Sequence, residues 1–141
     1  MRKSFVITGL SVVALVVLAA CTKSANTAAT GKPIASTTVD NLTATLSNST
    51  GQLKQGQQDV TLAFTDSSGK PVDVGAVSLN FHMPGMGGMA AMNDSVTFTT
   101  TSTPGVYSGK VSVSMAGEWQ GQLAYEGPAG SGKTTFTVTA Q

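Results

Sequence analysis

Residues 77–82 read VSLNFH, with an apolar residue at every second position. Such alternation is typical of a β-strand with one face on a core and the other toward solvent. Val77, Leu79 and Phe81 then share the inward face, and His82 lies on the outward face. The stretch predicts a half-buried strand.

Other short runs alternate in the same way on both sides of this stretch. They lie at about residues 42–46, 60–64, 96–98, 107–115, 119–125 and 136–138. Turn-forming sequences separate them, such as DSSGKP at 66–71 and Pro104-Gly105, and no run has a helical period. The spacing predicts an all-β domain over residues 39–141, an immunoglobulin-like antiparallel β-sandwich of about seven strands.

The composition argues against several classes of function. Charged residues make up 11% of the chain and the net charge is +1, so no basic surface for nucleic acid is expected. A single cysteine excludes an internal disulfide framework. One histidine and scattered carboxylates reveal no catalytic triad or carboxylate pair, so we do not expect an enzyme.

The N-terminus has the pattern of a bacterial lipoprotein signal peptide, expected over residues 1–20. Arg2 and Lys3 precede an apolar run over residues 5–18, and the run ends in LAAC at 18–21, which resembles a lipobox. Acylation of Cys21 would supply the two or more chains that stable anchoring needs. This predicts a protein of the bacterial cell envelope, held on the extracytoplasmic face of a membrane by Cys21. The alternatives are a plain membrane anchor or a secretory signal with an incidental cysteine.

Residues 22–38 are small and polar without periodicity. Such a segment buries too little apolar area to offset its ordering entropy, so we expect a flexible tether over residues 21–38.

Residues 127–134 read GPAGSGKT and satisfy the P-loop pattern from Gly127 to Thr134. A working P-loop needs a following helix whose amides and dipole hold phosphate, whereas TFTVT at 135–139 has a strand pattern. We therefore expect a glycine-rich hairpin turn and no nucleotide ligand.

Residues 82–92 read HMPGMGGMAAM, which places Met83, Met86, Met89 and Met92 three residues apart. Thioethers are soft, neutral donors that favour Cu(I) and have no proton to lose. An extended conformation with three residues per turn would align the four sulfurs along one edge. His82 could add an imidazole nitrogen that also accommodates Cu(II).

A second interpretation of the same run needs no metal. Methionine is an adaptable packing residue, so the loop could cap the open end of the sandwich or contact a partner or membrane as an exposed apolar surface. Both interpretations remain open from the residues alone.

Three motifs resemble the YtkA-like and FixH-like domains of bacterial envelope proteins: MPGMG at 83–87, PGVY at 104–107 and MAGEW at 115–119. The resemblance covers about residues 60–138. It implies a small immunoglobulin-like sandwich and a link to copper delivery and haem-copper oxidase assembly. Family members often carry a histidine shortly after the Met-Gly pair, whereas this chain has Gly88-Met89.

Together these features predict a membrane-anchored extracytoplasmic copper-binding protein, a Cu(I) chaperone or scavenger that serves a copper-protein partner such as a haem-copper oxidase or a copper pump. The alternative is a non-metal interaction module that uses the methionine-rich loop as its contact surface. Tyr107 resembles a tyrosine corner that ties a loop to the sheet, and Trp119 is expected in the core.

Overall fold

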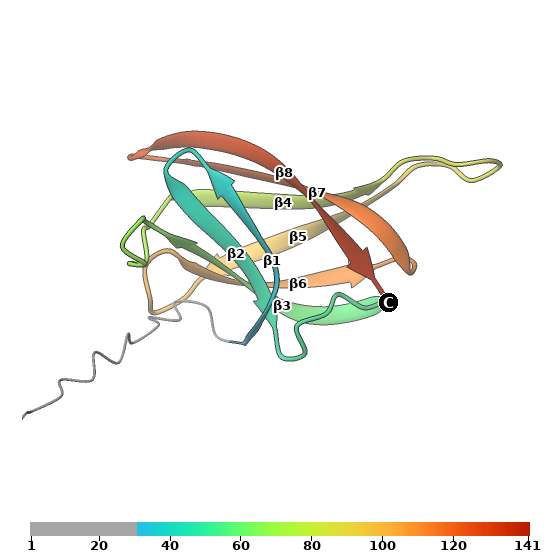
Figure 1. Ribbon diagram of the computed structural model, residues 1–141, viewed down its shortest axis with the longest axis horizontal. Coiled ribbons are helices and arrows are strands. Elements are labelled where there is room, and N and C mark those ends of the chain that lie inside the picture. The colour runs from blue at the N-terminus through green and yellow to red at the C-terminus, as the bar shows by residue number, and fades with distance from the viewer. Residues whose placement is uncertain (1–30) are drawn as a thin grey trace, which may run out of the picture.

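The computed structural model describes residues 31–141, which form an all-β domain (Figure 1). Its strands are β1 (Lys32–Val39), β2 (Leu42–Asn48), β3 (Gly56–Thr65), β4 (Ala76–Met83), β5 (Met92–Thr100), β6 (Val106–Val113), β7 (Gly117–Gly127) and β8 (Gly130–Ala140). Every pairing between these strands is antiparallel, and no helix occurs over residues 31–141. The predicted all-β class is confirmed. The predicted signal peptide and the predicted lipidation site, Cys21, lie outside the described residues.

The eight strands follow the order β1-β2-β3-β6-β5-β4-β7-β8 in one curled sheet. The sheet is nearly closed, because β1 and β8 contact each other at its two edges. Strand β5 connects the two halves of the sheet: residues 92–96 pair with β4 and residues 97–100 pair with β6. The arrangement is compatible with the predicted sandwich and is barrel-like in its closure.

Strand β1 corrects the prediction of a tether that extends to residue 38 and of about seven strands. It pairs with β2 along its length, with a register shift between Pro33 and Ala35. The shift hides the period of two that would mark a strand in the sequence. Small and β-branched residues fit against the neighbouring strand here, so pairing, rather than apolar content, orders residues 32–38.

The core lies inside the curled sheet, between its two halves. Its largest fully buried side chains are those of Trp119, Phe64 and Phe81. The Phe64 ring meets Tyr107 and Tyr125 edge-on, with centroids 6.0 and 5.6 Å apart. The predicted core position of Trp119 is confirmed.

Tyr107 ties a loop to the sheet, as predicted, but its partners lie 33 and 34 residues upstream instead of the few residues typical of a tyrosine corner. The Tyr107 hydroxyl on β6 accepts a hydrogen bond from the Val74 amide at 3.3 Å and donates one to Asp73 Oδ1 at 3.1 Å. Both partners belong to the loop between β3 and β4, so this tyrosine ties that loop to the sheet.

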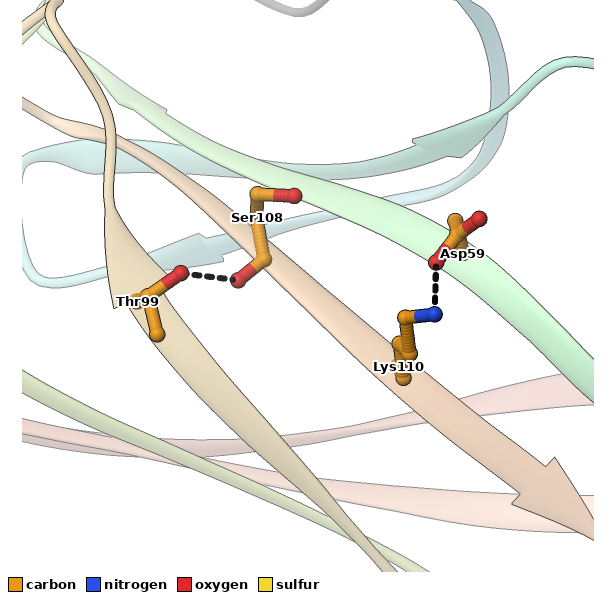
Figure 2. A network of polar contacts seen from close by, with 4 residues as sticks. All are labelled: Asp59, Thr99, Ser108 and Lys110. Atoms are coloured by element: carbon orange, nitrogen blue, oxygen red, sulfur yellow. Dashed lines mark hydrogen bonds and ion pairs between the residues drawn. The ribbon is translucent and has the colours of Figure 1, made fainter.

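Polar residues of β3, β5 and β6 contact one another on the outside of the sheet (Figure 2). Lys110 Nζ lies 3.6 Å from Asp59 Oδ1, and Thr99 Oγ1 donates to the Ser108 carbonyl at 3.3 Å. The ion pair is largely solvent-exposed, so it contributes at most about 1 kcal/mol to stability. This side of the sheet faces water.

The P-loop-like residues form a hairpin, as predicted. The β7–β8 ladder continues to the pair Gly127 and Gly130, which leaves Pro128-Ala129 as a two-residue turn. A strand rather than a helix follows the turn, and Lys133 pairs with Ala124 inside the ladder.

Among residues 31–141, no helix has the length and apolar character needed to cross a membrane.

Candidate functional site

The connection between β4 and β5 extends well beyond the rest of the sheet (Figure 1). Met83 pairs with Met92 at the end of the ladder, and Met86 forms an isolated antiparallel bridge with Met89. The Met89 amide donates to the Met86 carbonyl at 3.0 Å, and Gly87 takes the positive φ of 59° that the tip requires.

The hairpin therefore arranges the four methionines as two cross-strand pairs. Directly opposed residues of antiparallel strands lie on the same side, with Cβ atoms about 4.5–5.5 Å apart. A single extended edge with three residues per turn, the arrangement considered from the sequence, does not form. The chain doubles back at Gly87-Gly88 instead.

The four methionines differ in burial. Met86 and Met89 expose 72% and 53% of their surface at the hairpin tip, whereas Met83 is 8% exposed and belongs to the core. Met92 is half-buried and packs against that core. Treating all four as loop residues is therefore wrong for Met83, because the last position of β4 still points inward.

A cavity of about 480 Å³ lies at the base of the hairpin, between it and the β6–β7 turn. Its wall includes the four methionines of the hairpin and His82. Met115, Ala116 and the first residues of β7 form the opposite side. The structure thus brings all the predicted metal-site side chains of the hairpin to one hollow.

Met115 is a fifth thioether at this cavity and was not predicted as a site residue. In the sequence it continues the alternation of β6, 23 positions after Met92, and nothing local links the two. The contact arises because the β6–β7 turn meets the hairpin at the same end of the sheet.

Hydrogen bonds hold the Met115 segment in place. The Asp94 carboxylate on β5 accepts from the Ser114 amide at 2.8 Å and from the Ser114 hydroxyl at 2.8 and 2.9 Å. The indole Nε1 of Trp119 donates to the Met115 carbonyl at 3.0 Å. These bonds join the turn to β5 and β7, so Met115 is positioned on a fixed backbone.

His82 is half-buried on the outward face of β4, as predicted. It pairs across the sheet with Asn93 on β5 and Gln120 on β7. Its Nδ1 lies 2.9 Å from Asn93 Oδ1. The imidazole therefore has a fixed neighbour on one side while it lines the cavity.

The donors at the cavity are mostly neutral. Of the residues that line it, Glu118 is the only carboxylate, and its side chain was not singled out from the sequence. Within residues 31–141, His, Cys, Asp and Glu side chains form no group of three suited to a metal ion. Thioethers and a single imidazole are thus the main donors, a chemistry that fits soft Cu(I).

A comparison with protein families bears on the same region. The model of the YtkA-like family matches residues 36–124, more than half of the chain. The chain belongs to the YtkA-like family. The matched region of this YtkA-like protein begins in β1, ends in β7 and contains His82, the hairpin methionines and Met115. No curated protein and no solved structure gives a significant match.

The match refines the resemblance over about residues 60–138. It begins earlier, within the segment expected to be a tether, and ends before β8. The earlier start agrees with the structure of this YtkA-like protein, in which β1 pairs with β2 as part of the sheet. The FixH-like resemblance stays a prediction.

Proposed function

We propose that this YtkA-like protein binds Cu(I) as cargo and acts as a copper chaperone or scavenger rather than as an enzyme. The observation that carries the proposal is the convergence of five methionines and His82 on one cavity. Two or three thioethers suffice to hold Cu(I), and they remain unprotonated in acid.

The ligands would come from Met83, Met86, Met89, Met92 and His82, with Met115 from the opposite wall. Exposed Met86 and Met89 at the tip would meet the incoming ion first, and Met83 and Met92 lie nearer the base. The Glu118 carboxylate on the cavity wall adds an attraction for a cation without building a hard-ion site.

The cellular setting of the proposal rests on the sequence. The lipobox-like residues before Cys21 support a lipid anchor on the extracytoplasmic face of a bacterial membrane. A copper protein of the envelope, such as a haem-copper oxidase or a copper pump, would then be the partner. We propose no nucleotide and no nucleic acid as ligands.

Competition with a coloured Cu(I) chelator under reducing conditions tests the proposal on the full-length protein. The parent should withdraw copper from the chelator. Met86→Leu combined with Met89→Leu keeps the apolar volume and removes both sulfurs, so Cu(I) affinity should fall at least about tenfold. A parent that stays folded and withdraws no copper would contradict the proposal.

A second candidate function rests on a separate observation. Met86 and Met89 are the exposed large apolar side chains of residues 31–141, and they stand together at a protruding tip. Such a tip could contact a partner protein or a membrane without any metal. The leucine variant separates the two functions, because it preserves an apolar contact surface and removes the two sulfurs at the tip.

A further inference from the structure

The hydrogen bond between His82 and Asn93 determines which ring nitrogen carries the proton. The amide oxygen of Asn93 only accepts hydrogen bonds, and it lies 2.9 Å from His82 Nδ1. Nδ1 must therefore be the donor. In the neutral imidazole, Nε2 then has no proton and presents a lone pair.

The contacts of Asn80 agree with this direction of the bond. Asn80 Nδ2 also donates to Asn93 Oδ1, at 3.3 Å, and to Gln122 Oε1, at 3.4 Å. With its amide turned the other way, Asn93 would present its NH₂ to the NH₂ of Asn80. The oxygen of Asn93 therefore faces both donors, Asn80 and His82.

His82 lies where the lone pair on its Nε2 can bind a ligand in the cavity. Its ring lines the methionine cavity, and over residues 31–141 no hydrogen bond to Nε2 is found. We propose that Asn93 is a positioning residue that holds His82 as the Nδ1–H tautomer and presents Nε2 to the cavity as a preformed nitrogen ligand. This inference rests on the proposed copper function.

A preformed nitrogen ligand changes which ions the cavity holds. Thioethers alone select Cu(I), whereas imidazole also suits Cu(II). A second hydrogen-bonded shell that orients a histidine ligand typically affects metal affinity about 10–100-fold. Asn93 would thus act on copper binding without touching the ion.

The tautomer can be measured without any metal. The chain has one histidine, so ¹H–¹⁵N correlation spectra of the imidazole give a single spin system. In metal-free protein at mildly alkaline pH, the parent should show the proton on Nδ1. A proton on Nε2 in the parent would overturn the inference.

Substitutions at an exposed site test the role of Asn93. Asn93→Ala should mix the two tautomers and lower Cu(I) affinity about 10–100-fold. Asn93→Asp keeps an oxygen acceptor and should restore both the tautomer and the affinity. Ser95→Ala removes the hydrogen bond from Ser95 Oγ to Asn80 Oδ1, which does not involve His82, so it should behave as the parent. Ser95→Asp controls for added negative charge.

Copper titrations then separate this inference from the proposed function. Support requires that Cu(I) shift the Nε2 resonance, that His82→Ala weaken binding of Cu(I) and Cu(II), and that Asn93→Asp rescue what Asn93→Ala loses. If His82→Ala and Asn93→Ala bind Cu(I) like the parent while Met86→Leu with Met89→Leu binds weakly, the thioether site stands and the role of Asn93 is wrong. If the folded parent binds no copper, both proposals are wrong.

Discussion

Met83 Cε occupies the space beside Gly117: a Cβ built on Gly117 would stand 3.1 Å from it. Met83 ends β4 and Gly117 begins β7, so this approach brings the β6–β7 turn against the base of the methionine hairpin. The cavity between them forms at this contact. A residue without a side chain is therefore part of how the candidate site is built.

Gly117→Ala should destabilise the protein and disturb the cavity. Gly117 has a φ of +139°, a conformation that L side chains rarely adopt, and the new methyl group would press on Met83. We expect a loss of about 1–3 kcal/mol in the free energy of unfolding, measured by urea denaturation.

Gly88→Ala is the matched control at the hairpin tip. Gly88 has no positive φ and has open space where a Cβ would stand, so this variant should unfold like the parent within about 0.5 kcal/mol. Equal losses of unfolding free energy in the two glycine variants would contradict the role given to Gly117.

Met83→Ala and Met86→Ala should separate packing from ligation. Met83 is 8% exposed within the core, so its truncation should cost about 2–5 kcal/mol of unfolding free energy. Met86 is 72% exposed, and its truncation should cost less than about 0.5 kcal/mol. Metal-free urea curves measure both, and a large cost at Met86 would show that the tip is packed in a way the structure does not contain.

Tyr107→Phe should lower the free energy of unfolding at neutral pH. It should also make this free energy fall less steeply at alkaline pH. At neutral pH the lost hydrogen bonds to Asp73 and Val74 should cost about 1–3 kcal/mol. Burial raises the pKa of Tyr107 above 10.0 in the folded state. The unfolded chain therefore loses this proton first, and stability falls as the pH rises through and above about 10.

Urea midpoints measured from about pH 8 to pH 11 test this sign. The parent should lose stability more steeply than Tyr107→Phe over the upper part of the range. Tyr125 contributes in the same direction in both proteins, because its hydrogen bond to Asp40 raises its pKa. Parallel curves would mean that Tyr107 ionises alike in the folded and unfolded states.

Cys21→Ser should yield a product without acyl chains. The lipobox-like sequence predicts a thioether-linked lipid on Cys21, which should partition the parent into detergent and appear in its mass. The serine variant should stay in the aqueous phase or keep its uncleaved apolar segment. A native parent with an unmodified Cys21 would disprove the lipoprotein prediction.

The sequence by itself determined most of the strands and the turns at residues 66–71 and 104–105. The alternation of Val77, Leu79 and Phe81 is a local property, because successive side chains of any strand point to opposite faces. The glycine-rich turn after β7 and the methionine spacing are equally local. Family membership, too, lies in short motifs along the chain, and the match over residues 36–124 confirms it.

Only the tertiary structure decided how these parts meet. Strand β1 escaped prediction because a register shift breaks its alternation and its order comes from pairing with β2. Met115 became a cavity residue because the β6–β7 turn and the methionine hairpin lie at the same end of the sheet. The bond from His82 to Asn93 depends on cross-strand register. Strand order and register join residues that are distant along the chain, and no local pattern encodes which of them become neighbours.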